Sequence, residues 1–393
     1  MKERLLLLPF ALFLIILPFP GTIAVRMLTL TLAFFIAWRI WWVQRPHNEP
    51  LPGKRVIGFW VVVCLLSLIY AVDPVSSLKE MKSELLNSLA AFFAFFVIAG
   101  NLDRARYLMR ALAVGLIIIG GWALVAWVGN GFYWDETGRY GGIGVFSTYL
   151  VTILPAIVWL TLADDSIFWK RLAATLLPLI LLLAFATTQR AIWPALLIEF
   201  AVFLAISRRQ PIYAKFPLKT VFIFVVVITT MLFSLQEKER FGVNATGESV
   251  SADSRLEFWP AVVSEIAKHP WTGGGFGRHA MKKAYPNLIP EYNTWLWHSH
   301  NVILNYGISM GIPGILSIIL VFGYFAAFFW QAANNPLSLL AGAAGLALVL
   351  GVLLRNQFND FFIRDQSLLF WAQVGLFARL CTSPSPKSHE STA

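Results

Sequence analysis

The chain has 393 residues, of which 58% are hydrophobic and 13% charged, and its mean hydropathy is +0.68. A water-soluble domain carries roughly a quarter charged residues, so this composition excludes a soluble enzyme and predicts an integral membrane protein. The formal net charge of +10 collects in loops predicted to be cytoplasmic, and it gives no reason to expect a nucleic-acid partner.

Apolar runs separated by proline, glycine or charged residues predict an all-α protein with about twelve transmembrane helices. Residues 1–235 carry predicted helices 1–9, residues 236–301 form one large polar loop, residues 302–381 carry predicted helices 10–12, and residues 382–393 form a disordered cytoplasmic tail. The apolar runs lie at about 5–19, 22–43, 56–72, 85–100, 107–129, 144–163, 168–187, 190–207, 217–236, 302–330, 337–354 and 363–380.

Lysine and arginine predict the orientation of these helices. They gather in the loops at residues 44–55, 101–110 and 207–219, which the positive-inside rule places in the cytoplasm. The loop from about Leu235 to His300 then lies outside the cytoplasm. It holds seven Lys or Arg and seven Asp or Glu, so any phosphate binding there must come from particular arginines.

Arg190 is the first candidate functional residue in chain order. It lies between two apolar runs at the predicted outer face, where a charge is costly unless it is paired or hydrated. A guanidinium fits the oxygens of a phosphate in two-point contact, which favours an anion-binding role. The alternative is an interfacial arginine beside Trp193 in the aromatic belt, and the sequence alone does not separate the two.

Arg255 lies in a segment at about 251–268 that has helical spacing and Ser or Asp capping signals. An anion-binding role is possible, but considered alone a salt bridge with Asp253 or Glu257 is the favoured interpretation. The glycine-rich segment at 273–277 fits neither the P-loop nor the dinucleotide fingerprint. A plain turn is therefore favoured over a phosphate cradle.

His298 and His300 end the long polar loop immediately before an apolar run. Imidazole titrates near neutral pH, so a histidine at this place can act as a general base. Two interfacial histidines, or two ligands of a metal ion, are the alternatives. A zinc site needs three or four ligands, and the nearby His269 and His279 match no known zinc spacing. Asn301 is expected to hold an imidazole or to cap the following helix.

The last predicted outer loop, at 355–365, is unusually polar for a gap between two spans. Asn359, Asp360 and Arg364 either line a sugar-binding mouth or satisfy helix ends, and the two alternatives have equal weight. No outer loop contains an Asp-x-Asp sequence, so the carboxylates that hold Mg²⁺ or Mn²⁺ against a lipid diphosphate are missing. Two arginines can supply the positive charge instead.

Three motifs resemble, in order and spacing, those of the O-antigen ligase and polymerase superfamily of bacterial membrane glycosyltransferases. They are Thr-Thr-Gln-Arg190, Ser-Arg255-x-x-x-Trp259 with the downstream Pro-Trp-Thr-Gly-Gly-Gly-Phe-Gly277, and His-Ser-His300-Asn301-x-x-Leu304. The chain looks like an O-antigen ligase, most specifically from about Arg255 to Gly314. This resemblance implies a GT-C-like architecture in the bacterial inner membrane, with the large loop and the active site facing the periplasm.

The resemblance also implies roles for particular residues. Arg190 and Arg255 would bind the diphosphate of the donor, and His300, next to Asn301, would act on the acceptor hydroxyl. His298 has no assured counterpart, so which histidine is the base remains open. The implied donor is O-antigen linked to undecaprenyl diphosphate, the implied acceptor is lipid A–core oligosaccharide, and the implied transfer inverts the sugar without a metal or another cofactor.

Two further functions remain as alternatives. The first is an O-antigen polymerase or a protein O-oligosaccharyltransferase of the same superfamily. A polymerase commonly has two large outer loops, whereas one is predicted here. The second is a flippase or transporter of lipid-linked oligosaccharides, which would carry charges within its spans. The predicted spans are nearly free of charge, which favours the glycosyltransferase.

Overall fold

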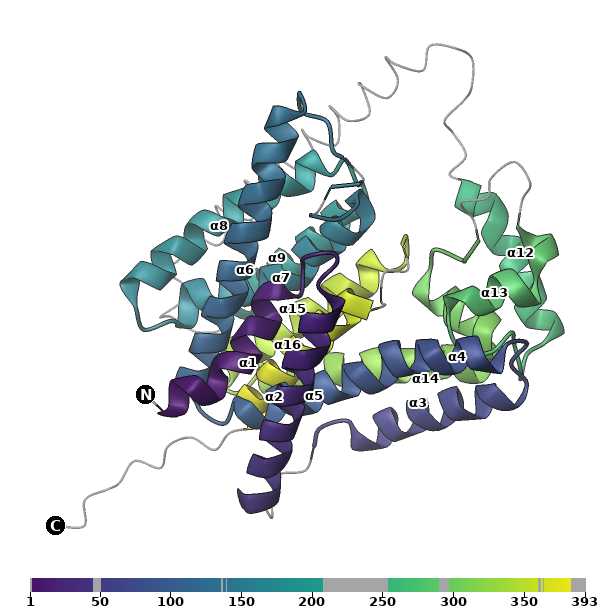
Figure 1. Ribbon diagram of the computed structural model, residues 1–393, viewed down its shortest axis with the longest axis horizontal. Helices are drawn as coiled ribbons and strands as arrows, with labels where there is room; N and C mark the ends of the chain where they lie inside the picture. Colours follow the sequence, from purple (N-terminus) through teal and green to yellow (C-terminus); the bar gives the residue numbers. More distant parts are fainter. Residues whose placement is uncertain are drawn as a thin grey trace.

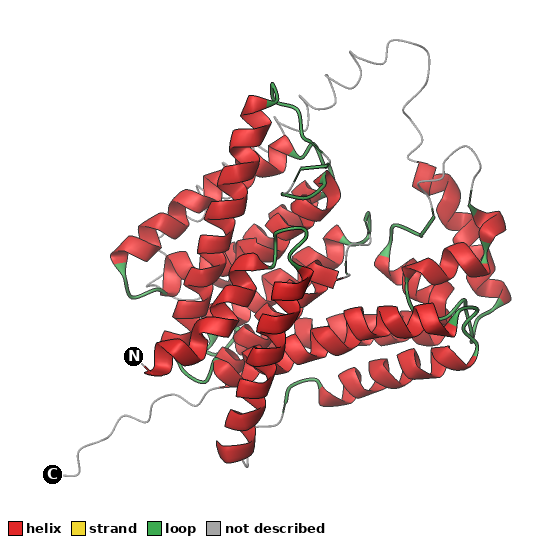
Figure 2. Ribbon diagram, in the orientation of Figure 1, coloured by secondary structure: helices red, strands yellow, loops and turns green. Residues whose placement is uncertain are grey.

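A computed structural model describes residues 2–44, 51–135, 137–138, 140–207, 254–289, 297–359, 362 and 364–382, and within these ranges it contains helices and turns but no strand (Figure 1, Figure 2). The predicted all-α class is thereby confirmed. The helices are α1 (Lys2–Ile16), α2 (Ile23–Gln44), α3 (Lys54–Leu66), η1 (Ser67–Ile69), α4 (Pro74–Met81), η2 (Lys82–Leu86), α5 (Asn87–Ile98), α6 (Leu102–Gly129), α7 (Ile143–Ala163), α8 (Ile167–Ala186), α9 (Ile192–Ser207), α12 (Ser254–Lys268), α13 (Arg278–Ala284), η3 (Pro286–Leu288), α14 (Val302–Ala332), α15 (Leu339–Arg355) and α16 (Arg364–Thr382).

Six of the described helical stretches are long and apolar enough to cross a membrane. They are α2, the continuous stretch Pro74–Ile98, α6, α7, α8 and α14, while α9 and α15 are apolar but shorter. The protein is therefore a multi-pass membrane protein. Each apolar run predicted from the sequence is helical except 217–236, which lies outside the described residues, as does most of the predicted tail. The total of about twelve spans stays a prediction.

Polar side chains cap the first turns of several helices. Asp73 accepts a hydrogen bond from the backbone N–H of Ser76 at the start of α4, at 2.9 Å. Asn101 does the same for Arg104 at the start of α6, also at 2.9 Å. A cap satisfies an N–H group that has no partner within the helix, so these residues determine where the helix begins.

The centre of the bundle is α16, which packs against α5, α15 and α7. Trp371 of α16 stacks on Trp60 of α3 at 5.7 Å between ring centroids, and Phe92 of α5 meets Trp371 edge-on at 5.7 Å. Gln373 is fully buried and donates from Nε2 to the carbonyl of Thr152 in α7 at 2.9 Å. The central position of α16 gives the Gln373 N–H₂ group a protein partner that lipid could not provide, while its Oε1 accepts no hydrogen bond among the described residues.

Glu199 on α9 is one of the few charged residues that fall within a predicted span. Its side chain is fully buried against Gly351 of α15. A side chain on residue 351 would clash with the Glu199 carboxyl group. Neither carboxyl oxygen has a hydrogen-bond partner among the described residues. A single acidic residue leaves the mean hydropathy of a run almost unchanged, so the apolar pattern concealed it.

Connections predicted to share one side of the membrane contact one another in the structure. On the predicted outer side, the turn between α8 and α9 meets the turn between α15 and α16 through Gln189 and Asn359, whose amides are 3.2 Å apart. On the predicted inner side, Arg104 donates to Glu3 at 2.9 Å. These contacts agree with the predicted alternation of the helices. Which side faces the periplasm stays a prediction.

Helix α14 is broken near its first third, at Gly311 and Pro313. Gly311 has φ 66° and ψ −158°, outside the helical region. Pro313 has no N–H, and the N–H of Ile312 donates instead to the carbonyl of Pro270 at 2.7 Å. In a regular helix, the N–H of residue 313 would donate to the carbonyl of Ser309 and that of residue 312 to the carbonyl of Ile308. The break therefore leaves both carbonyls without a partner inside α14.

The glycine-rich segment at 273–277 satisfies those released carbonyls. The N–H of Gly274 donates to Ile308 at 3.1 Å, and the N–H of Gly275 donates to Ser309 at 3.0 Å. Gly273 passes so close to the backbone of Ser309 that a Cβ atom would clash. The N–H groups of Gly274 and Gly275 are therefore already bonded to α14, and they hold the loop against this helix. Because they are not free to bind a phosphate, the structure disfavours a phosphate cradle.

Candidate functional site

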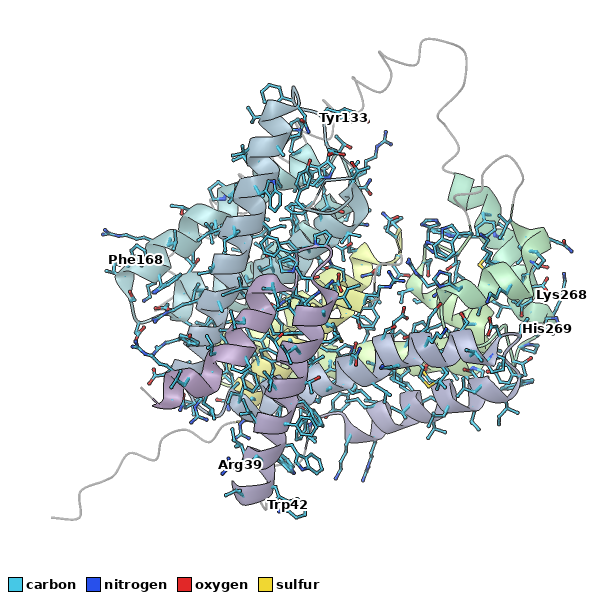
Figure 3. All side chains as sticks on the ribbon, viewed as in Figure 1. Arg39, Trp42, Tyr133, Phe168, Lys268 and His269 are labelled. Atoms are coloured by element: carbon cyan, nitrogen blue, oxygen red, sulfur yellow. The ribbon has the colours of Figure 1, made fainter. Side chains whose placement is uncertain are left out.

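Helices α12 and α13 form a small unit beside the bundle, within the predicted loop at 236–301 (Figure 1). Phe258, Val262 and Ile266 of α12 form an apolar cluster with Met281 of α13 and Ile308 of α14. Lys268 and His269, at the C-terminal end of α12, mark the edge of this unit (Figure 3). The apolar cluster holds the unit against the start of α14.

Two polar contacts join α13 to α4 and its N-cap on the other side of the unit. Glu80 contacts Nδ1 of His279, and the N-cap Asp73 forms an ion pair with Lys283. The hydrogen bond from Lys283, together with the one from the N–H of Ser76, lowers the pKa of Asp73 below its ordinary value. The unit is thus attached on two faces, which restrains the segment at 297–301 that runs along it.

The two histidines of that segment lie against each other. His298 is 4% exposed and His300 is 3% exposed, and their ring centroids are 3.8 Å apart. The backbone N–H of His300 donates to Nδ1 of His298 at 3.2 Å. His300 has φ 52°, a left-handed conformation that costs a residue other than glycine about 1–3 kcal/mol. Such strain, held in place by surrounding contacts, is common at functional sites.

The surroundings of His298 favour a positioning role for it. Its Nδ1 accepts the backbone N–H of His300, and its Nε2 lies 3.5 Å from Nη1 of Arg278. Both ring nitrogens of His298 are thus engaged within the protein. The Arg278 guanidinium also covers the ring of Trp297, with its carbon 5.2 Å from the ring centroid. His300 is therefore the better candidate for the base.

Helix α12 is attached directly to this segment. Trp259 donates from Nε1 to the carbonyl of Ser299, the residue between the two histidines, at 2.8 Å. Arg255 precedes Trp259 by one helical turn. The side chain of Arg255 lies outside the described residues, so its anion-binding role and the alternative salt bridge both stay predictions.

Asn301 caps α14, which was one of its two expected roles. Its Oδ1 accepts from the N–H of Leu304 at 3.0 Å, and its Nδ2 donates to the carbonyl of Gln357 at 3.1 Å. The N–H of Val302 donates to the carbonyl of Asn356 at 2.9 Å. The start of α14 is thus tied to the turn that follows α15, which supports a structural role for Asn301.

The same turn reaches the segment that carries Arg190. Asn359 is 3% exposed, and its amide lies 3.2 Å from that of Gln189, the neighbour of Arg190 in sequence. This contact with a neighbouring turn favours a structural role for Asn359. Asp360 lies outside the described residues. Arg190 itself is partly buried, and its phosphate-binding role stays a prediction.

Trp193 bears on the alternative interpretation of Arg190. The aromatic belt of a membrane protein places tryptophan side chains at the lipid–water boundary. Trp193 is only 2% exposed and packs within the protein core. The expected belt partner of Arg190 therefore does not face lipid, which weakens the interfacial alternative.

Two arginines of this region were missed in the sequence. Arg355 is fully buried at the end of α15, and Arg278 lies beside His298. The only signal for Arg355 was a charged residue directly after an apolar run, which is also how any transmembrane helix ends. Arg278 follows the glycine-rich segment and has no pattern that distinguishes it from a surface arginine.

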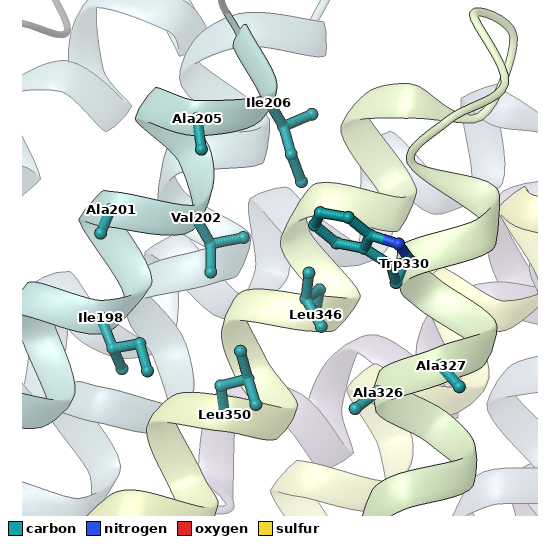
Figure 4. Close-up of a pocket in the computed structure, with 10 residues that line it drawn as sticks. All are labelled: Ile198, Ala201, Val202, Ala205, Ile206, Ala326, Ala327, Trp330, Leu346 and Leu350. Carbon is teal, nitrogen blue, oxygen red and sulfur yellow. The ribbon is translucent and has the colours of Figure 1, made fainter.

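Within the described residues, no three side chains of His, Cys, Asp or Glu form a cluster that would hold a metal ion. A cavity of about 580 Å³ lies elsewhere, between α9, α14 and α15 (Figure 4). Its lining is apolar and includes Val202, Trp330 and Leu350. It can accommodate hydrocarbon but offers no group for catalysis.

The family described as O-antigen ligase matches residues 173–319. The match begins within α8 and ends in α14 beyond the break at Gly311, and it includes Arg190, Arg255, His298, His300 and Asn301. It confirms the resemblance found in the sequence motifs. No curated protein matched the chain.

Proposed function

We propose that this chain, whose residues 173–319 match the O-antigen ligase family, transfers O-antigen glycan from undecaprenyl diphosphate to lipid A–core oligosaccharide. The transfer takes place at the periplasmic face of the bacterial inner membrane. The observation that carries the proposal is the buried pair of His298 and His300, held between α12 and the start of α14.

In the proposed reaction, His300 takes the proton of the acceptor hydroxyl. The hydroxyl oxygen attacks the anomeric carbon of the donor sugar, and the bond from that carbon to the diphosphate breaks on the opposite face, which inverts the centre. Undecaprenyl diphosphate leaves with the bonding electrons. Arg190 and Arg255 stabilise the charge that develops on it, and His300 later releases its proton to solvent.

The apolar cavity of Figure 4 is consistent with a donor that carries a long hydrocarbon chain. Its lining on α9 runs from Ile198 to Ile206. Ile198 is six residues beyond the start of α9, which is about 9 Å along the helix axis. If the diphosphate binds at Arg190, its prenyl chain can extend along α9 into this cavity.

The proposed mechanism predicts that transfer is independent of divalent metal. Two arginines provide the charge that Mg²⁺ or Mn²⁺ would otherwise provide to the leaving diphosphate, so activity is expected to persist in excess EDTA without added metal. The measurement is the rate of glycan transfer by purified protein before and after chelation. Loss of activity that one divalent ion restores would contradict the prediction and indicate a metal bound at His298 and His300.

The proposed orientation predicts which positions react with a membrane-impermeant thiol reagent. In a protein lacking its two cysteines, Cys64 and Cys381, a new cysteine is placed at His269 or at Asp103. These side chains are 53% and 87% exposed. Once the outer membrane is permeabilised, the cysteine at 269 is expected to react and that at 103 to remain unlabelled. The reverse pattern would place His300 on the cytoplasmic side and exclude a ligase.

Product analysis separates the ligase from its alternatives. Purified protein is incubated with lipid-linked glycan and with lipid A–core oligosaccharide or a protein acceptor. A ligase forms glycan attached to lipid A–core, a polymerase lengthens the lipid-linked glycan, and a protein O-oligosaccharyltransferase modifies the protein. A flippase forms no new glycosidic bond. Glycan transfer to lipid A–core is the expected result.

A further inference from the structure

Arg355 is buried without any exposed surface at the C-terminal end of α15. Burying a guanidinium costs several kcal/mol unless its N–H groups are hydrogen-bonded. Its position in the last turn is favourable, because the helix dipole places partial negative charge there. The protein covers the Arg355 side chain completely, so its role is best read from the contacts that it makes with the protein.

Those contacts join separate parts of the chain. Nη2 of Arg355 donates to Oγ of Ser147 at 2.6 Å and to the carbonyl of Gly144 at 3.4 Å, both in the first turns of α7. With the amide of Asn359 flipped, its oxygen accepts from Nη1 at 3.0 Å and lies 3.2 Å from the amide of Gln189. One planar guanidinium therefore holds the turn at 355–359 against α7.

The turn at 355–359 lies between the two halves of the candidate site. Toward Arg190, the amide of Asn359 lies 3.2 Å from that of Gln189 in either orientation. Toward His300, the carbonyls of residues 356 and 357 accept hydrogen bonds from Val302 and Asn301. Displacing the turn would change the distance between the segment that carries Arg190 and the segment that carries His300.

We infer that Arg355 is a positioning residue that holds the turn at 355–359 so that the donor-binding and proton-accepting segments keep their relative positions. This inference rests on the proposed function for its effect on catalysis. The contacts themselves do not depend on that function. Because a misplacement of about 1 Å costs on the order of 10²-fold in rate, a positioning residue is expected to affect turnover strongly.

The test compares Arg355→Met and Arg355→Lys with a matched control, Gln373→Leu. Methionine approximates the arginine's volume but cannot bond to Ser147 or Asn359. Lysine keeps the positive charge, but its ammonium group cannot reproduce the planar set of N–H donors of the guanidinium. Gln373 is equally buried and also bonds to α7, but its partner is the Thr152 carbonyl within the bundle.

Arg355→Met is expected to lower kcat by about 10²-fold with little change in the KM for the donor, because Arg190 and Arg255 are retained. Arg355→Lys should recover part of the loss, and Gln373→Leu should leave kcat near the original value. Equal losses in the methionine and control variants would show general loosening of the bundle and overturn the inference. So would a methionine variant with normal kcat.

Hydrogen exchange provides a measurement that does not require transfer activity. The amide of Val302, bonded to the carbonyl of Asn356, is expected to lose protection in Arg355→Met and to keep it in Gln373→Leu. Unchanged protection in Arg355→Met would overturn the inference. If the original protein transfers no glycan to any acceptor but Val302 loses protection as expected, the proposed function fails while the positioning of the turn stands.

Discussion

Replacement of His300 by alanine is expected to lower glycan transfer by about 10²–10⁴-fold while the amount and folding of the protein stay unchanged. The physical reason is that the acceptor hydroxyl is a weak nucleophile until a base accepts its proton. His300 is buried beside His298 and follows a segment bonded to α12, so an imidazole is held in one place. Transfer rates at saturating donor and acceptor measure the effect.

His298→Ala is the matched control for this prediction. It removes an equally buried imidazole from the same segment and with it the acceptor for the N–H of His300. Because His298 positions its neighbour, partial activity is expected to remain. The assignment would be wrong if His298→Ala abolished transfer while His300→Ala turned over at close to the original rate.

Arg190→Lys is expected to reduce transfer by about 10²-fold although the positive charge is retained. A guanidinium contacts two phosphate oxygens at once, whereas an ammonium acts as a point charge and loses this geometry. The same loss is expected for Arg255→Lys. Steady-state rates, together with the KM for the lipid-linked donor, show whether the change affects ground-state binding or the departure of the diphosphate.

Arg104→Lys is a suitable control for the two lysine variants. Arg104 lies at the start of α6 on the predicted cytoplasmic side, where it pairs with Glu3. Its replacement is expected to leave transfer unchanged. Normal transfer by both Arg190→Lys and Arg255→Lys would show that these arginines are structural, and the interfacial interpretation of Arg190 would then be correct.

The location of the helices was predictable from the sequence because a bilayer imposes a local requirement. Each span needs about 20 consecutive apolar residues, and a polar or charged break must separate it from the next. The run at 302–330 therefore corresponds closely to α14, and the segment at about 251–268 corresponds to α12. The cap at Asn301 was also predictable, since capping involves residues only a few positions apart.

The break in α14 and the role of the glycine-rich segment were not predictable, because they depend on two segments that meet only in the fold. Gly311 and Pro313 indicate a weak point in a helix, but not what compensates for it. The carbonyls of Ile308 and Ser309 are satisfied by residues 274 and 275, more than thirty positions earlier in the chain. From sequence alone, an ordinary turn was the favoured interpretation of these glycines.

For the candidate site, the sequence predicted which residues carry the proposed chemistry: two arginines, a histidine and the asparagine that follows it. How their segments are held became visible only in the tertiary structure. Arg355, Asn359 and Gln189 join them through contacts between helices that are far apart in sequence, and such contacts leave no periodic pattern in the chain. Hydrophobic periodicity reports which face of a helix is buried, whereas the partner of a buried polar group depends on which other helix lies against it.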